Sequence, residues 1–320
     1  MNDSKPIRIG TRGSLLARTQ AGMIRNQLLP LAGGRPVELV IISTSGDQLA
    51  NQPLAQIGGK GLFVKEIEAA LLAGEIDLAV HSAKDVPVEI PDGLSLSATP
   101  PREAPNDVWF GHAGQSILKL PRGAVVGSSS LRRQSQLLML RPDIQVQPLR
   151  GNIDTRLKKV RDGVIAGTIL ALSGLRRAEL LPAEATILSE DEFIPAAGQG
   201  TLVLETRTDN AAIRSLINQI HDVQSAAALA FERGIVRKLA GDCLAPIGVC
   251  AMPRTAAGRN GWIVRAIAAR PDGKASARAT LLTDDPSING LNALYQPLLE
   301  ALESRGVKDI LGTAGTHGGT

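Results

Sequence analysis

Apolar and polar residues follow one another along the first third of the chain in a pattern that predicts strands alternating with helices. Alternation with a period of two residues indicates a strand, and apolar residues three or four positions apart indicate a helix. The expected elements are a strand at 7–10, a helix at 14–29, a strand at 37–43, a helix at 62–73 and a strand at 78–81. This order is typical of a parallel, doubly wound sheet.

A proline-rich break at residues 99–105 predicts a crossing between domains. A second alternating block follows, with elements expected at 124–127, 131–140, 144–146, 153–160 and 168–172. We therefore expect two similar α/β domains with a cleft between them. The strand-like stretch 201–205 is expected to return the chain to the first domain.

The pattern changes again from residue 222 onward. An alanine-rich helix to 239, a loop containing Gly-Asp-Cys, strands near 247–252, 262–269 and 275–282, and a helix at 291–303 predict a third domain of α+β type. The predicted fold class is α/β, with two doubly wound domains and a smaller α+β C-terminal domain. The predicted ranges are residues 1–102 with 199–218 for domain 1, 103–198 for domain 2 and 219–320 for domain 3.

Composition narrows the classes of function. The chain has 320 residues, of which 43% are hydrophobic, enough for a core in each domain. No apolar run approaches the roughly 20 residues of a membrane-spanning helix, and the N-terminus lacks a secretory layout, so we expect a cytoplasmic location and no membrane partner. Two cysteines, Cys243 and Cys250, are too few for a metal site of ordinary ligand number. We expect no structural disulfide in a reducing compartment.

The net charge of +4 favours anionic ligands, whereas an aromatic content of 2% leaves few faces on which bases could stack. Small carboxylates or phosphates are therefore expected in preference to nucleic acid. The turn Thr11-Arg12-Gly13-Ser14 lies between the first strand and the first helix, where free backbone N–H groups and the helix dipole attract an anion. Ser14 could equally be a simple N-cap and Arg12 a solvated side chain.

The same arrangement recurs at 127–133 and again at 149–156, each after an expected strand and at a helix start. The serines of the first of these turns are Ser128 and Ser130. The arginines in and after the two turns are Arg132, Arg133, Arg150, Arg156, Arg176 and Arg177. The planar guanidinium group binds a carboxylate through two hydrogen bonds. The alternative is an arginine-rich solvated face, and we expect at least one of Arg176 and Arg177 to be of that kind.

Three further segments could carry chemistry. The sequence Ala-Val-His-Ser-Ala-Lys-Asp-Val-Pro at 79–87 ends an apolar strand with Lys84 and Asp85, and a buried carboxylate there could stabilise a developing cation. A lone histidine such as His81 is more often structural. Residues 58–63 resemble a phosphate loop only superficially and are expected to form a mobile lid with Lys60 and Phe63. Cys243 is expected on a loop bounded by glycine and proline, and Cys250 in a buried strand.

Together these residues resemble the porphobilinogen deaminase family, also called hydroxymethylbilane synthases. The segments that carry the resemblance span residues 11 to 248 and read TRGSLLA, GGKGLFVKEIE, AVHSAKDVP, VGSSSLRRQSQL, LRGNIDTRL, PAAGQG and GDCLAPIG. The resemblance implies a transferase of tetrapyrrole (heme) biosynthesis. It would join four porphobilinogen molecules head to tail, with loss of ammonia, and a final hydrolysis would give hydroxymethylbilane. Each ring would bring two carboxylates. The resemblance also implies three domains, two of them like a periplasmic binding protein and the third bearing Cys243.

The resemblance also implies roles for individual residues. Cys243 would hold a dipyrromethane cofactor through a thioether, and Asp85 would be the catalytic carboxylate. The other residues implied to bind the cofactor are Ser14, Lys84, Ser128, Ser130, Arg132, Arg133 and Arg156. The residues implied to bind substrate carboxylates are Arg12, Arg150, Arg156 and Arg177. No metal is implied, and nothing demands more than a monomer.

The sequence departs from the family pattern at Gln56, Asn106 and the tripeptide Ala166-Gly167-Thr168. These departures weaken what the resemblance implies for the lid contacts and the early hinge, but not for the core site. The rival interpretation from another class is a periplasmic-type carboxylate-binding protein without catalysis, which would share the two-domain cleft. The expected absence of a signal sequence and the Cys243 loop count against it.

Overall fold

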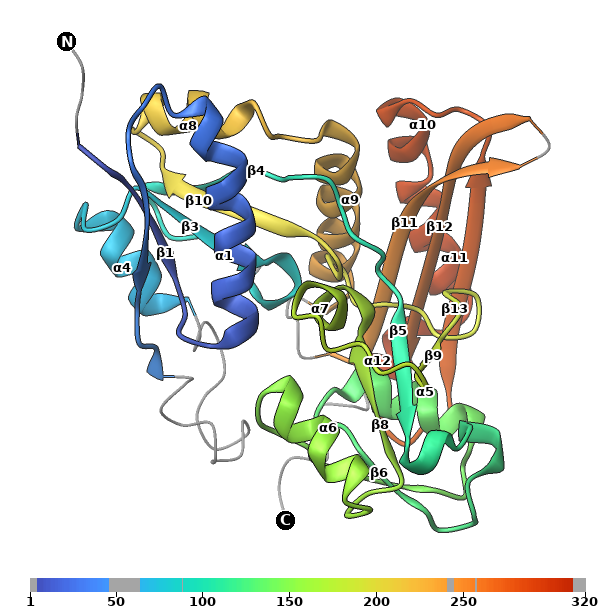
Figure 1. Ribbon diagram of the computed structural model, residues 1–320. Coiled ribbons are helices and arrows are strands. Elements are labelled where there is room, and N and C mark those ends of the chain that lie inside the picture. Colours follow the sequence, from blue (N-terminus) through green and yellow to red (C-terminus); the bar gives the residue numbers. More distant parts are fainter. Residues whose placement is uncertain (1–4, 46–63, 88, 241–244, 257, 313–320) are drawn as a thin grey trace. The chain divides into compact units, whose positions relative to one another are not determined.

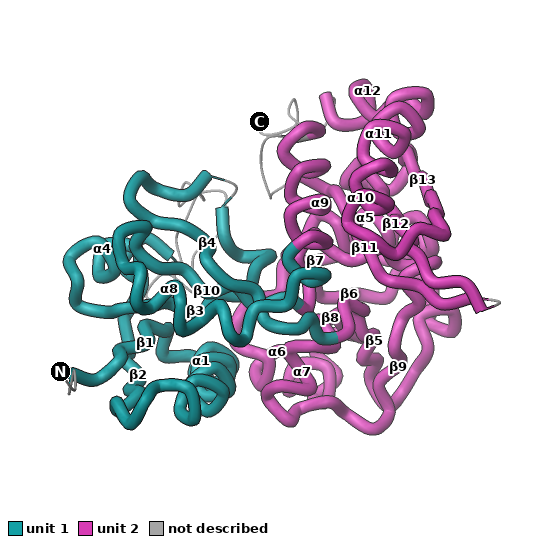
Figure 2. Tube along the Cα trace, turned by 90° about the horizontal axis from the view of Figure 1, so that it is seen from above, with its two compact units in different colours: residues 1–103, 201–226 teal, residues 104–200, 227–320 magenta. Residues whose placement is uncertain are grey.

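The computed structural model describes residues 5–45, 64–87, 89–240, 245–256 and 258–312 (Figure 1). The chain forms two compact units, Met1–Glu103 with Thr201–Ala226 and Ala104–Gly200 with Ala227–Thr320 (Figure 2). The first and second of these are called unit 1 and unit 2 below, and each is described by itself. Among the described residues, no helix is both long and apolar enough to cross a membrane.

Unit 1 is built on a five-stranded sheet with the order β2-β1-β3-β10-β4. The strands are β1 (Ile7–Thr11), β2 (Val37–Ile41), β3 (Leu78–Ser82), β4 (Leu94–Ala98) and β10 (Leu202–Arg207). Strands β2, β1 and β3 are parallel, and β10 is antiparallel to both β3 and β4. The sheet is therefore mixed, because the strand that returns late in the sequence runs in the opposite direction.

Helices cover both faces of this sheet. They are α1 (Leu15–Leu28), α4 (Lys65–Leu72) and α8 (Ala211–Asn218), with short 3₁₀ turns at Leu29–Leu31 and Ala83–Asp85. Leu78 and Val80 of β3 pack in one core cluster with residues of α1 and α8. Ala79 packs in another with residues of α4. Successive strand residues point to opposite faces, so the sheet is wrapped on both sides, as the alternating pattern predicts.

Unit 2 contains a second five-stranded sheet with the order β7-β6-β8-β5-β9. Its strands are β5 (Asp107–Gly111), β6 (Val125–Gly127), β7 (Gln145–Gln147), β8 (Gly167–Ala171) and β9 (Thr186–Ile187). Its helices are α5 (Leu131–Leu140), α6 (Ile153–Arg161) and α7 (Leu172–Arg177), with 3₁₀ turns at His112–Gly114 and Ile117–Lys119. Strands β6, β7 and β8 are parallel, and β5 is antiparallel to β8.

The C-terminal part of unit 2 is a three-stranded antiparallel sheet packed against helices. Its elements are α9 (Val223–Ala240), β11 (Ile247–Ala256), β12 (Arg259–Ala269), β13 (Ser276–Thr283), α10 (Ile288–Ala293), α11 (Tyr295–Glu303) and α12 (Val307–Gly312). Trp262, Leu298 and Val264 lie in one apolar core with residues of α9. The predicted fold class, two doubly wound α/β parts and a smaller α+β part, is confirmed. The exact three-domain boundaries stay a prediction.

One expected helix is divided in the structure. The single helix predicted at 291–303 is α10 followed by α11, with the break at Leu294. Pro297 explains the division, because proline has no N–H to donate and its ring clashes with the carbonyl four residues earlier. That carbonyl belongs to Ala293, the residue at which α10 ends.

Candidate active site

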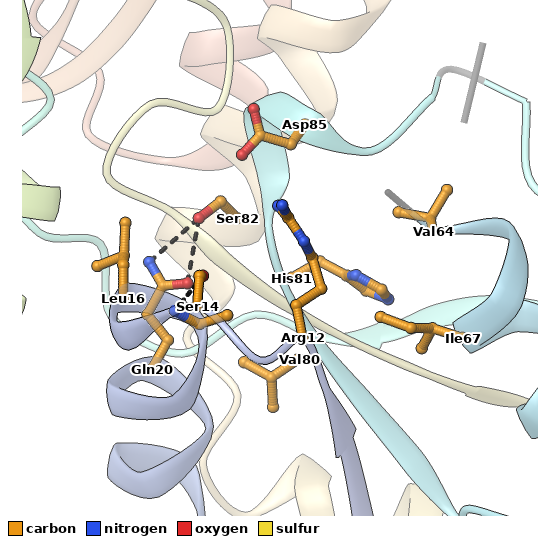
Figure 3. Close-up of a pocket in the computed structure, with 11 residues that line it drawn as sticks. Arg12, Ser14, Leu16, Gln20, Val64, Ile67, Val80, His81, Ser82 and Asp85 are labelled. Carbon is orange, nitrogen blue, oxygen red and sulfur yellow. Dashed lines mark hydrogen bonds between the residues drawn. The ribbon is translucent and has the colours of Figure 1, made fainter. Parts of the chain in front are cut away.

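Unit 1 has a small pocket, about 70 Å³ in volume, where β1 and β3 end and α1 begins. Its polar lining residues are Arg12, Ser14, Gln20, His81, Ser82 and Asp85 (Figure 3). Parallel strands end at the same edge of a sheet, and this edge is where open α/β sheets bind ligands. Arg12 and Ser14 were chosen from one sequence segment and Asp85 from another, and the fold brings all three to one pocket.

Ser14 is the N-cap of α1, and its hydroxyl accepts a hydrogen bond from the backbone N–H of Ala17 over 3.3 Å. The same residue lines the pocket, so capping and ligand contact are compatible. Gln20, one turn and a half further along α1, donates from Nε2 to Ser82 Oγ over 3.1 Å. Gln20 and Ser82 were not singled out from the sequence. The available signal was a glutamine on the apolar face of α1, where it is buried beside Ala21 and Ile24.

Asp85 lies in the 3₁₀ turn Ala83–Asp85 that directly follows β3. The expectation that this carboxylate is buried is wrong, because Asp85 is exposed although it lines the pocket. Ala83 and Val86 are buried on either side of it. The backbone N–H of Ala83 also donates to Thr201 O over 3.0 Å, which fixes the turn to β10's start. Because the turn is anchored by a buried residue on each side, Asp85 is left on its outer side.

The serine-rich turn of unit 2 caps α5. Ser130 accepts a hydrogen bond from the backbone N–H of Arg133 over 3.4 Å, and Ser128 Oγ accepts one from the N–H of Ser130 over 3.2 Å. Ser129 Oγ donates to Leu149 O over 2.9 Å and accepts from Leu149 N over 3.0 Å. The turn after β6 is therefore fastened to the turn that precedes α6. Two of the three predicted anion-binding turns lie side by side.

Arg132 and Arg133 are buried and turn toward Asp107 at the start of β5. Arg132 Nη1 is 2.7 Å from Asp107 Oδ2, and Arg133 donates to Oδ1 from Nε over 3.0 Å and from Nη2 over 2.7 Å. Gln199 Nε2 adds a fourth hydrogen bond to Asp107, at Oδ1, over 3.1 Å. The predicted role of the two arginines, binding the carboxylates of a cofactor, stays a prediction. Asp107 was not singled out from the sequence.

Two guanidinium groups share one carboxylate inside the protein. Burial by itself would raise the pKa of Asp107, but the charges of Arg132 and Arg133 outweigh it and hold that pKa well below its ordinary value. Burial lowers the pKa of Arg132, and Asp107 opposes the change. Asp107 is fully buried, with a relative exposure of 0%. It is therefore the anion that allows two adjacent guanidinium groups to lie in the interior.

We expect Asp107→Asn to destabilise the protein by about 3–5 kcal/mol, because removal of one partner leaves buried charges uncompensated. Chemical denaturation would measure the loss. Asp162→Asn is the matched control, since Asp162 forms its ion pair with Lys158 on the surface, where the side-chain exposures are 46% for Asp162 and 74% for Lys158. That variant should unfold like the unmodified protein.

The stability difference between the unmodified protein and Asp107→Asn should also depend on pH. A carboxyl group whose pKa is lower in the folded state stabilises the fold above its unfolded-state pKa, which is about 4 for an aspartate. That stabilisation is lost as the pH falls below this value, toward the folded-state pKa. The difference in free energy of unfolding between the unmodified protein and Asp107→Asn should therefore shrink below about pH 4. A difference that stayed constant to pH 2 would contradict the assignment.

The remaining arginines lie at the other strand ends of unit 2. Arg150 and Arg156 are half-buried, and Arg156 Nε donates to Gly151 O over 2.8 Å. Gly151 has φ 104°, a backbone conformation that favours glycine. Arg177 Nη2 donates to Gly200 O over 2.7 Å. Arg176 is exposed, which confirms the expectation that one of that pair is solvated.

Several sequence predictions fall outside the described residues, namely those on Cys243, Lys60, Phe63 and the departure at Gln56. Lys84 is described and half-buried, beside Asp85 in the same turn. Cys250 is buried in β11, as expected. Asn106 donates from Nδ2 to Leu188 O over 3.0 Å, so at this departure the side chain joins two segments that are 82 residues apart in the sequence.

The departure at Ala166-Gly167-Thr168 is explained by packing. A Cβ atom on Gly167 would lie 2.2 Å from Cη2 of Trp109, so the indole occupies the space that a side chain would need. Thr168 donates from Oγ1 to Gly127 O over 2.8 Å and so joins β8 to the end of β6. Trp109 and Gly167 therefore form a matched pair.

The fold and these sites define the class as an α/β protein with arginine and serine side chains at the carboxyl ends of its strands. Residues 7–215 match the family model described as "Porphobilinogen deaminase, dipyromethane cofactor binding domain". The chain is 44% identical over 308 residues to the porphobilinogen deaminase of Syntrophotalea carbinolica, which covers 96% of each chain. It is 48% identical over 242 residues to that of Syntrophobacter fumaroxidans, covering 76% of this chain and 78% of the relative. The chain belongs to the porphobilinogen deaminase family.

Solved structures of binding proteins resemble the fold more distantly. The methionine binding protein MetQ matches with a TM-score of 0.44 and 17% identity, covering 74% of this chain and 95% of that one. The periplasmic aliphatic sulphonate binding protein SsuA from Escherichia coli matches with a TM-score of 0.40 and 15% identity, covering 73% and 70%. A similarity of this size supports no functional argument.

Proposed function

We propose that the chain is a transferase that condenses four porphobilinogen molecules stepwise, with loss of ammonia, into hydroxymethylbilane. The observation that carries this function is the family match over residues 7–215, together with 44% identity across 96% of the chain to a relative of that name. The pocket that contains Arg12 and Asp85 supports it, because it supplies a cation and a carboxylate at the ligand-binding edge of the sheet. No observation favours the binding-protein alternative.

The chemistry assigns a role to the carboxylate. When ammonia leaves porphobilinogen with the C–N electron pair, the remaining methylene pyrrole is a cation. Asp85 balances this charge, and its contribution grows when bound rings displace water from around it. The substrate also carries an acetate and a propionate, for which Arg12, Arg150, Arg156 and Arg177 are the proposed partners.

The turn before α5 and the adjoining turn before α6 suit a ligand with several carboxylates, because the first supplies serine hydroxyls and the second the half-buried Arg150 and Arg156. The proposed holders of a dipyrromethane cofactor are Cys243, through a thioether, with Ser14, Lys84, Asp85, Ser128, Ser130, Arg132, Arg133 and Arg156. When bound, this group supplies the free pyrrole α-carbon from which the product chain starts. A cytoplasmic monomer that needs no metal, nucleic acid or membrane completes the proposal.

The function is tested by incubating the purified protein with porphobilinogen and following both products. We expect four molecules of ammonia for each molecule of linear tetrapyrrole, identified by mass spectrometry. Binding of porphobilinogen without release of ammonia would instead indicate the carboxylate-binding protein.

A further inference from the structure

Three ionisable side chains meet on the α4 side of the sheet of unit 1, and one of them, His81, lines the pocket. They are His81 on β3, Glu205 on β10 and Glu68 on α4, with relative exposures of 6%, 0% and 8%. His81 pairs with Val203 in the register of the two strands, and Glu205 pairs with Ala79. All four residues therefore share one face, since strand residues two apart point the same way.

Glu205 fixes the orientation of the imidazole. His81 Nε2 is 3.0 Å from Glu205 Oε2, and both side chains are almost completely buried. An ionised carboxylate can only accept, so Nε2 carries the hydrogen and donates it. In the neutral ring the lone pair is then on Nδ1, and the tautomer is set by the carboxylate. His81 also lines the pocket that holds Asp85 and Arg12, and its ring points toward Val64 and Ile67, which line the same pocket (Figure 3).

Other charged groups also lie around His81. Glu205 faces it from β10, Glu68 belongs to the same buried group on α4, and Arg12 and Asp85 line the pocket. Burial first, and then the nearby charge of Glu205, raise the pKa of Glu68. Glu205, whose Oε2 is 3.0 Å from His81 Nε2, is the carboxylate placed to stabilise an imidazolium.

The condensation needs a base that accepts a proton. The α-carbon of the accepting pyrrole donates its electron pair to the methylene cation, and a C–C bond forms. That carbon still bears hydrogen, and the C–H electron pair must return to the ring to restore aromaticity. The released proton needs a base, yet Asp85 must stay ionised in order to balance positive charge on the substrate.

We propose that His81, oriented by Glu205, accepts this proton at Nδ1 in each condensation and then passes it to solvent. The proposal rests on the proposed function. It makes Glu205 a positioning residue that holds the tautomer and stabilises the imidazolium, an arrangement in which a carboxylate supports a histidine base.

The test uses porphobilinogen carrying deuterium at its free α-carbon. We expect His81→Gln to lower kcat by about 10²–10⁴-fold, the range for loss of a general base, with a much smaller change in KM. Proton removal then limits the rate, so the deuterium isotope effect on kcat should rise above that of the unmodified enzyme. Glu205→Gln should lose about 10–100-fold and show the same isotope effect, because the ring stays but its orientation is no longer fixed.

The matched control is His221→Gln, a histidine of unit 1 whose Nδ1 accepts a hydrogen bond from Thr99 N over 3.1 Å outside the pocket. It should retain both kcat and the small isotope effect. Intact mass and thermal unfolding report cofactor loading and folding for every variant. If His81→Gln does not fold, Glu205→Gln decides the question through its isotope effect.

The outcomes separate the two proposals. An unmodified enzyme that makes no tetrapyrrole overturns the proposed function. If it does make tetrapyrrole, near-normal kcat in the folded His81 variant overturns the role of His81. A higher KM with an unchanged isotope effect overturns it as well, because the histidine would then bind a carboxylate rather than take a proton.

Discussion

Asp85→Asn should keep its covalently attached group and lose nearly all turnover. Asparagine has the same shape as aspartate but no negative charge, so the methylene cation formed from porphobilinogen would lack its counter-ion. Removal of a single group that stabilises transition-state charge typically costs about 10²–10³-fold in kcat, and the loss here should be at least that large. Steady-state kinetics would give kcat, and intact-mass spectrometry would show whether the attached group is still present.

The exposure of Asp85 makes a control necessary, since a surface aspartate is often replaceable. Asp92→Asn is suitable, because Asp92 is also exposed and also belongs to unit 1 but does not line the pocket. It should have normal turnover. Near-normal rates in Asp85→Asn would exclude this carboxylate from the chemistry, whereas loss of the attached mass would assign it to cofactor assembly instead.

The elements with strong periodicity could be predicted from the sequence. The helix expected at 131–140 is α5, with the same first and last residue. The expected strands of the first third correspond to β1, β2 and β3. In these elements the local apolar pattern and the burial in the fold agree. The strand expected at 201–205 is β10, which joins β3 and β4 in unit 1.

Other elements were missed because their sequences carry little local signal. β4 reads Leu-Ser-Leu-Ser-Ala, and β5 follows directly after the proline-rich segment that was interpreted as a break. Both strands are stabilised by partners far away in the sequence, β10 for β4 and β8 for β5. Such pairings depend on the whole sheet, which the local pattern does not contain.

The same distinction applies to the sites. Motif residues such as Arg12, Ser14 and Asp85 could be selected from their positions after strands, and they do meet at one pocket. The groups that hold site residues could not be selected in this way. Asp107 lies 25 residues before Arg132, and Glu205 lies 124 residues after His81. Only the folded sheets bring these partners together, and they decide which charged groups are buried.

Cys243→Ser should abolish the extra mass that we expect on the unmodified protein, equal to two linked pyrrole units, and with it the activity. A thiolate attacks a methylene pyrrole cation readily, whereas a serine hydroxyl is a weak nucleophile without an adjacent base. Cys250→Ala is the matched control, because Cys250 is buried in β11 and should leave both mass and turnover unchanged. An active protein of bare sequence mass would show that growth needs no covalent anchor, and the arginines alone would then have to retain the product chain.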